Sequence, residues 1–158
     1  MTTNTKGMAG ALALAALTAC GSTNATRDDL PIRTSQLVAV HELEWRPLPG
    51  IAGAEQARLV GDPFQGSHRA YFRYPVGLAS PLHAHTHGDR GVVVSGTLSL
   101  AVDGAPAKRL GPGSFFSIPA GVPHVTRVEG SEPCVFFMER EGPFDVVLVE
   151  AATTARAR

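Results

Sequence analysis

Charged residues are scarce in this chain of 158 residues, and neither sign is in excess. Asp, Glu, Lys and Arg make up 18% of the sequence, and fourteen cations balance fourteen anions. No basic run is present that could neutralise a row of phosphates, so the sequence argues against a nucleic acid partner. Hydrophobic residues make up 44%, which is enough for a packed core and excludes a solvated, disordered polymer.

Cysteines and long hydrophobic runs are also lacking. The two cysteines, Cys20 and Cys134, stand far apart in the sequence, which argues against a disulfide framework. The longest apolar run, Met8–Leu17, has about ten residues, whereas a membrane-spanning helix needs about 20. Outside this run, no long stretch holds an apolar stripe of helical period. A single globular domain rich in β-strands is therefore expected.

The apolar run lies in an N-terminal segment with the features of an export signal. A polar start carrying Lys6 precedes the run, and small residues lead to Cys20. Residues 17–20, Leu-Thr-Ala-Cys, resemble the lipobox of bacterial lipoproteins, in which cleavage before the cysteine exposes a thiol that carries a lipid. The resemblance implies a signal peptide over residues 1–19 and a protein that is exported and anchored to a bacterial membrane through lipidated Cys20. The alternative is an ordinary secretory signal followed by a free cysteine.

The rest of the chain has the closely spaced turn residues that are typical of an all-β domain. Glycine and proline together supply 29 residues, and they lie between short apolar runs at intervals typical of tight turns. About eight short strands are expected, the first near Leu37 to Val40, which describes a sandwich or barrel. Residues 20–34 are small and polar and predict a flexible tether. We expect one domain over residues 35–150 and a polar tail over residues 151–158.

Four of the six histidines lie in two short segments that have the character of a metal site. His83 and His85 stand two residues apart, so in a strand they point to the same face and can bind one ion. Gly88 permits a turn after them, and Asp89 can then bring a carboxylate oxygen to the same ion. The second segment ends on His124, after a strand and a Pro/Gly turn. Ligands from two facing strands of a barrel are therefore expected.

These residues resemble the two sequence motifs of the cupin superfamily. The first motif, a Gly, His-x-His, an acidic residue and a Gly at set spacings, is matched by Gly77, His83, His85, Asp89 and Gly96, with Asp in place of the family's Glu. The second is matched by Gly113, Pro119, Gly121 and His124, while Val128 stands where the family has Asn. The resemblance covers roughly residues 36–150. It implies an antiparallel double-stranded β-helix, the cupin jelly-roll barrel.

The resemblance also implies a metal near the wide mouth of the barrel, bound by three histidines and a carboxylate. Carried over by position, the ligands are His83, His85, Asp89 and His124. Because Asp is one methylene shorter than Glu, its carboxylate reaches about 1.2–1.5 Å less far. A three-histidine site with Asp89 as a supporting partner therefore stays open. The cofactor is expected to be one divalent transition metal, and the ligands suit Fe, Mn, Ni, Cu, Co or Zn without selecting among them.

Three further side chains are candidates for the cavity. Tyr71 and Arg73 share one strand face ahead of the first motif and could bind an anionic substrate, but alternation alone does not say which face looks inward. His87 could join the histidine cluster if the strand continued through it, although Gly88 suggests that the strand ends first and leaves His87 at the rim. Cys134 is interpreted as a small buried hydrophobic residue.

Three functions are compatible with this reading. Three neutral imidazoles, one carboxylate and a divalent ion leave about one positive charge, or about two without Asp89, which favours a small anionic or enolisable ligand. The leading hypothesis is a lipid-anchored metallocupin with an oxygenase-type reaction. The alternatives are a non-catalytic module that binds a metal or small ligand, and a metal-dependent isomerase or lyase. The resemblance also implies a homodimer, because many cupins pair their barrels.

Overall fold

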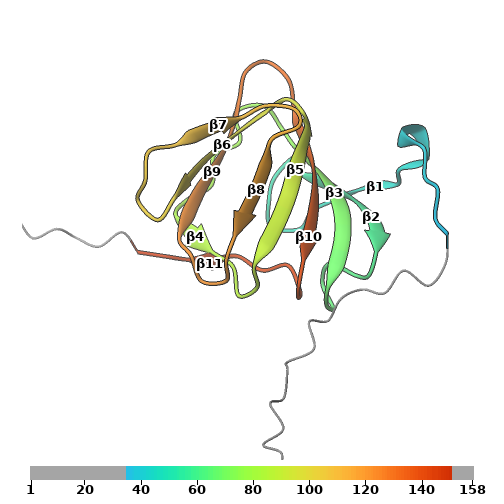
Figure 1. Cartoon of the computed structure of the whole chain (residues 1–158), viewed down its shortest axis with the longest axis horizontal. Coiled ribbons are helices and arrows are strands. Elements are labelled where there is room, and N and C mark those ends of the chain that lie inside the picture. The colour runs from blue at the N-terminus through green and yellow to red at the C-terminus, as the bar shows by residue number, and fades with distance from the viewer. Residues whose placement is uncertain (1–34, 151–158) are drawn as a thin grey trace, which may run out of the picture.

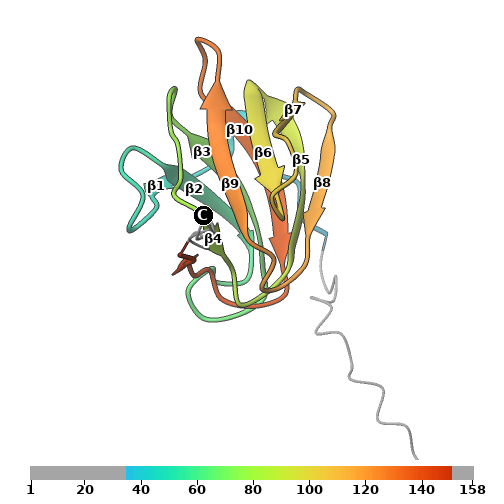
Figure 2. The same cartoon turned by 90° about the vertical axis from the view of Figure 1, so that its left-hand side faces the viewer.

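Two antiparallel sheets face each other and enclose the interior of the domain (Figure 1). The structure, a computed structural model, describes residues 35–150. In order across the first sheet lie β1 (Trp45–Pro47), β2 (Glu55–Val60), β3 (His68–Tyr74), β10 (Cys134–Arg140), β5 (Asp89–Ser95) and β8 (Phe115–Ile118). In order across the second lie β11 (Val147–Leu148), β4 (His83–Ala84), β9 (His124–Glu129), β6 (Thr97–Val102) and β7 (Lys108–Leu110). The predicted all-β antiparallel barrel is confirmed, and Figure 2 shows β6 and β9 side by side in the second sheet.

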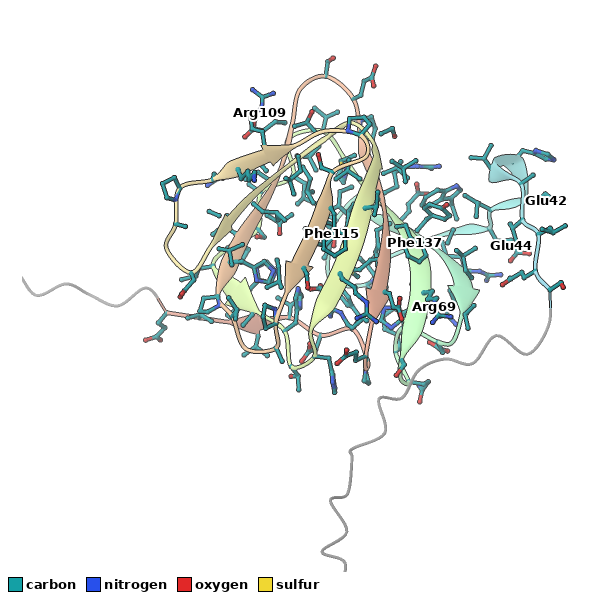
Figure 3. The ribbon with its side chains drawn as sticks, in the orientation of Figure 1. Glu42, Glu44, Arg69, Arg109, Phe115 and Phe137 are labelled. Carbon is teal, nitrogen blue, oxygen red and sulfur yellow. The ribbon has the colours of Figure 1, made fainter. Side chains whose placement is uncertain are left out.

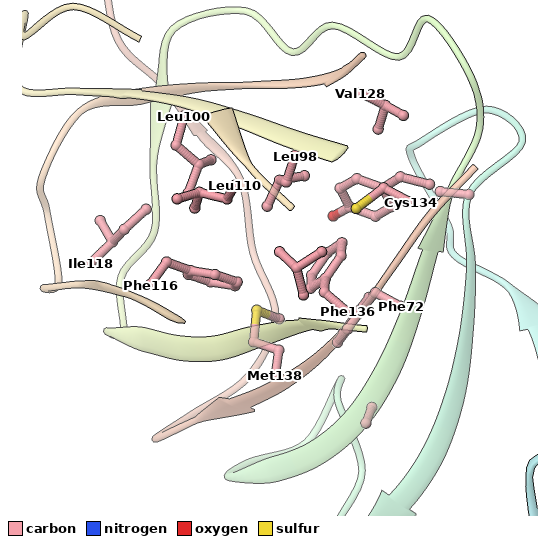
Figure 4. Packing of buried hydrophobic residues seen from close by; sticks show 14 of the residues in the cluster. Phe72, Leu98, Leu100, Leu110, Phe116, Ile118, Val128, Cys134, Phe136 and Met138 are labelled. Atoms are coloured by element: carbon pink, nitrogen blue, oxygen red, sulfur yellow. The ribbon is translucent and has the colours of Figure 1, made fainter. Parts of the chain in front are cut away.

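Period-two alternation in β3 and β10 builds the core between the sheets. Both strands bury every second residue, because successive side chains of a strand point to opposite faces. Phe72 is fully buried and stacks on Phe136, with ring centroids 5.6 Å apart. Figure 4 shows these rings gathered with Phe116 and Met138 in the space between the sheets. Cys134 is fully buried here, as expected, and burial raises the pKa of its thiol to about 11.

The predicted first strand, near Leu37 to Val40, is wrong. The segment holds instead a short 3-10 helix, η1 (Val40–Glu42), which projects from the barrel (Figure 1). Local hydrogen bonds explain the turn: the Ala39 N–H donates to the Glu42 carboxylate at 2.7 Å, and the Glu42 N–H donates to the Ala39 carbonyl at 2.9 Å. Leu37 is 95% exposed, so its apolar side chain packs against little of the domain. Apolar composition without a partner strand does not make a strand.

The outer face of the first sheet carries a row of apolar side chains. Tyr71, Phe137, Val92 and Phe115 stand directly opposite one another on β3, β10, β5 and β8. Tyr71 and Phe137 make an edge-to-face contact at 5.8 Å, and Phe115 is 63% exposed. Figure 3 shows Phe115 and Phe137 on this face. Such a face suits contact with another protein surface, and the homodimer expected from the sequence stays a prediction.

The expectations for the two ends of the chain fall outside the described residues. These are the signal peptide over residues 1–19, the lipidated Cys20, the tether over residues 20–34 and the tail over residues 151–158. Within residues 35–150, no helix has the length and apolar character required to cross a bilayer. Export and lipid anchoring therefore stay predictions.

Candidate metal centre

Three of the four predicted ligands come together as a compact buried cluster. His83 on β4 and His124 at the start of β9 are direct cross-strand partners, with ring centroids 4.3 Å apart. His85 follows β4 and lies 4.9 Å from the His83 ring and 5.1 Å from the His124 ring. One nitrogen of each ring lies within 4.8 Å of the other two, and all three residues are buried. The two sequence motifs thus meet through the pairing of β4 with β9.

Backbone carbonyls determine which nitrogen of each histidine faces the cluster. Nδ1 of His83 lies 3.0 Å from the Pro81 carbonyl, and Nδ1 of His124 lies 3.0 Å from the Val122 carbonyl. Nδ1 of His85 bonds the carbonyl of Asp145, far along the chain. Because a carbonyl oxygen only accepts, each Nδ1 must carry the proton. Each Nε2 therefore presents a lone pair, as a ligand to a divalent metal requires.

Burial favours the neutral form of His83 and His85. Desolvation lowers the pKa of His83, and it lowers the pKa of His85 to about 4, with the Arg140 guanidinium contributing to the second shift. A neutral imidazole is the form that binds a metal. His83 and His85 can therefore bind a cation at neutral pH without first losing a proton.

Asp89 lies beside the histidines, but a buried arginine binds its carboxylate. Its Oδ2 atom is 3.8 Å from Nε2 of His85 and 2.5 Å from Nη2 of Arg140. Arg140 is the cross-strand partner of Asp89, and its side chain is fully buried. Among the described residues, the histidines alone form the group of closely spaced potential ligands. The arrangement corresponds to the alternative in which Asp89 supports a three-histidine site.

Tyr71 and Arg73 do not line the cavity, which corrects their selection as cavity candidates. On β3 the buried positions are His68, Ala70, Phe72 and Tyr74, so the two candidates lie on the opposite, outer face. Arg73 pairs there with Glu55 at 2.7 Å and lies 3.8 Å above the centre of the Trp45 ring. The inward residue of this segment is Tyr74, which borders the cavity. Alternation established that the residues share a face, and packing determined which face it is.

His87 is also absent from the cavity wall. The chain leaves β4 before it, and its ring packs against the backbone of Gly142, where an added Cβ would lie 2.3 Å from the imidazole. His87 is half-buried and does not border the cavity. The strand ends before His87, as Gly88 suggested, so a third alternate histidine does not join the cluster.

Two residues important to the site were missed by the sequence analysis. Arg140 continues the inward row of Cys134, Phe136 and Met138 on β10, so alternation extended by two residues beyond Met138 places a cation inside. Asp145 has no such signal, because it lies in an irregular segment. Its carbonyl accepts from His85, and its carboxylate accepts from the backbone N–H and the hydroxyl of Thr86.

The three histidines open onto one cavity of about 750 Å³. Most of its wall is apolar, with Leu98, Leu100, Phe136 and Phe144 among the lining residues. The polar lining residues are few: besides the histidines, Asp89 and Arg140, they include Tyr74, Ser80 and Thr126. A pocket of this size with a small set of convergent polar groups suits a small molecule.

Comparison with known proteins agrees with this geometry. Residues 70–139 match the family described as Cupin domain, and this match contains the first motif, the second motif and Asp89. Residues 70–139 of this protein form a cupin domain. Residues of this cupin are 39% identical, over 69 positions, to dimethylsulfoniopropionate lyase DddQ of Ruegeria pomeroyi. That match covers 42% of this chain and 34% of the lyase, so the chain spans about a third of its curated relative.

Solved structures share the fold at low sequence identity. The polyketide cyclase RemF from Streptomyces resistomycificus superposes with a TM-score of 0.61 and 21% identity, over 76% of this cupin and 89% of the cyclase. KdgF from Halomonas sp. gives a TM-score of 0.55 and 21% identity, over 71% and 96% of the two chains. DddQ from Ruegeria pomeroyi gives 0.55 and 23%, over 75% and 64%. Together these structures support the barrel.

The donor set of this cupin fits a divalent transition metal. Three buried imidazoles point unprotonated nitrogens at one region, and the carbonyl acceptors on their far sides hold the rings in place. No thiolate lies in the cluster, so the site has no soft ligand that would favour one transition metal over the others. The site could hold one ion of this class, which supplies Lewis acidity when it is bound.

Acid should destabilise the metal-free protein because His85 resists protonation when folded. Its pKa is about 4 in the folded chain and about 6.5 when unfolded. Between pH 4 and pH 6.5 the unfolded chain binds this proton more readily than the folded chain does. The stability associated with neutral His85 is therefore fully present above pH 6.5 and is lost as the pH falls toward 4. The expected loss from His85 is on the order of 2 kcal/mol.

Urea unfolding of chelator-treated protein between pH 7 and pH 4.5 measures this effect. A His85→Gln variant should show a shallower pH dependence than the wild type. His41→Gln, at an exposed position, should leave the dependence unchanged. A free energy of unfolding that is flat over this range would contradict the prediction.

Proposed function

We propose that this cupin is a metal-dependent enzyme that acts on a small carboxylate-bearing molecule by non-oxidative Lewis-acid chemistry, as a lyase or isomerase does. The observation that carries the proposal is the cluster of three buried, Nε2-presenting histidines at the wall of a largely apolar cavity. Three neutral ligands leave the full charge of a divalent ion, about +2, in a site where Arg140 already compensates Asp89. An anionic oxygen is the ligand that this charge favours.

The chemistry of an elimination fits the groups that border the cavity. In such a reaction a base takes a proton from the carbon next to a carboxylate, and the electron pair left behind expels a leaving group, with its bonding electrons, from the next carbon. The Asp145 carboxylate, which borders the cavity, could accept this proton. A divalent ion held by His83, His85 and His124 would supply the positive charge that stabilises the negative charge developing on the carboxylate oxygens. The apolar wall excludes water and thereby strengthens this stabilisation. The role of this chain's residues is to bind the anion, hold its orientation and keep water out.

The relatives support the lyase or isomerase alternative more than the oxygenase hypothesis. DddQ is named for a lyase reaction on dimethylsulfoniopropionate, and RemF for a cyclisation. The match to DddQ covers about a third of that protein, so the substrate itself is not transferred. Turnover with dioxygen stays a hypothesis, which an oxygen electrode in the same reactions tests.

Proton NMR in D₂O with a panel of carboxylates tests the proposal. The panel includes dimethylsulfoniopropionate and other carboxylates with a leaving group on the carbon next to the α-carbon. We expect metal-dependent exchange of the α-proton or appearance of an unsaturated acid with at least one member, abolished by chelator and in His83→Ala. Tyr71→Phe, on the outer face, should keep full activity.

Two other results would separate the remaining hypotheses. Saturable binding of carboxylates without exchange or product would contradict the proposal and favour the non-catalytic binding module. Consumption of dioxygen in proportion to product would contradict it in favour of an oxygenase.

A further inference from the structure

A buried arginine controls whether the acidic residue of the first motif can reach the metal centre. We infer that Arg140 holds the Asp89 carboxylate away from the ion, so that the centre has three histidine ligands and takes an external anion as its negatively charged ligand. The inference rests on the proposed function, since it concerns the metal that the histidines would bind.

The pairing of β5 with β10 brings the Arg140 guanidinium to the Asp89 carboxylate. Asp89 opens β5 and is the direct cross-strand partner of Arg140 on β10. Residues opposite each other in an antiparallel pair have Cβ atoms about 4.5–5.5 Å apart, so the short aspartate side chain meets the guanidinium across the strands. The bond from Nη2 to Oδ2, 2.5 Å long, is the result.

The two carboxylate oxygens of Asp89 have different surroundings. Oδ2, which is the oxygen near Nε2 of His85, is bound by Arg140. Oδ1 is buried and, among the described residues, receives no hydrogen bond. A buried carboxylate oxygen without a partner is stabilised by any cation that it can reach. Asp89 would therefore turn to the ion if Arg140 no longer held it.

The surroundings of Arg140 keep its guanidinium in place. Its side chain is fully buried, and the guanidinium carbon lies 4.8 Å from the centre of the Phe144 ring. Nη1 lies 3.9 Å from Oδ1 of Asp145, whose backbone carbonyl binds His85. Arg140 is thus enclosed by two carboxylates and an aromatic face, which favour the cation at this position.

The ligand class follows from the charge. With Asp89 neutralised by Arg140, an ion bound by three neutral imidazoles keeps a charge of about +2. A carboxylate ligand would reduce this charge to about +1 and occupy a coordination position. Arg140 therefore acts as a positioning residue that keeps both the charge and the position available for an anionic oxygen ligand.

Visible absorption of the full-length protein loaded with Co²⁺ tests the inference, because the Co²⁺ bands respond to the ligand set. Asp89→Asn should leave the wild-type spectrum unchanged and alter Co²⁺ affinity by less than about tenfold, since the residue is not a ligand. Arg140→Met should change the spectrum by releasing Asp89, and it should weaken the binding of added azide by about tenfold. The double variant Arg140→Met with Asp89→Asn should recover the wild-type spectrum.

Controls and contrary outcomes are distinct. Arg109→Met removes an exposed ion pair with Glu129 and should change neither the spectrum nor azide binding. If Arg140→Met does not fold, the spectrum of Asp89→Asn alone tests whether Asp89 is a ligand. A changed Asp89→Asn spectrum would show that Asp89 is already a ligand and would overturn the inference while the proposed function stands. Failure of the wild type to bind Co²⁺ would instead overturn the proposed function, and the inference with it.

Discussion

His83→Ala and His124→Ala are each expected to lower the affinity for a divalent transition metal by at least about 100-fold, since even supporting residues of metal sites cost 10–100-fold when lost. The two rings are cross-strand partners, and their nitrogens belong to the same cluster. Asp89 cannot replace either, because Arg140 binds its carboxylate. Removal of one imidazole leaves two protein ligands.

Competition with a chromophoric chelator measures this affinity, and circular dichroism checks that each variant keeps its fold. His87→Ala provides a matched control, because His87 is half-buried near the cluster but outside it. This control should bind metal like the wild type. Wild-type affinity in His83→Ala or His124→Ala would show that the cluster is a set of hydrogen-bonded core histidines.

Phe72→Ala is expected to lower the free energy of unfolding by about 4 kcal/mol, the usual cost of deleting a fully buried aromatic ring. Phe72 has no exposed surface and contacts four other rings: Phe136 at 5.6 Å, Phe144 at 6.1 Å, His68 at 6.4 Å and Tyr74 at 6.5 Å. Phe144 in turn contacts the His85 ring at 5.8 Å. The core that holds the sheets together is therefore continuous with the support of the candidate centre.

Denaturant unfolding followed by fluorescence or circular dichroism measures the difference. The matched control is Phe115→Ala, which removes the same side chain at a position that is 63% exposed and should cost within about 0.5 kcal/mol. Equal destabilisation by the two variants would contradict the assignment of Phe72 to the centre of the core.

The parts of the site that the sequence predicts are those set by local spacing. His83 and His85 are two residues apart, and the second motif places His124 at the start of a strand, so their convergence requires only that β4 pair with β9. The parts of the site that the sequence does not predict are contacts between residues far apart in the chain. The Asp89 carboxylate is bound by Arg140, which is 51 residues away in the sequence. The His85 ring is bound by the backbone carbonyl of Asp145, which is 60 residues away. No local pattern reports such pairings.

The errors have the same origin. Leu37 and Val40 have strand composition, but among the described residues they have no strand partner, and a side chain cap at Glu42 stabilises a turn instead. Alternation places Tyr71 and Arg73 on one face of β3, but that face points outward because Phe72 and Tyr74 enter the core. Burial, unlike periodicity, is a property of the assembled sheets.

Metal analysis of the purified full-length protein is the most direct test of the central claim, that His83, His85 and His124 form a metal centre. Expressed in metal-replete medium and analysed by inductively coupled plasma mass spectrometry, the wild type should contain about one divalent transition metal per chain, and His83→Ala should contain almost none. A folded wild-type protein that carries no transition metal under these conditions would contradict the account.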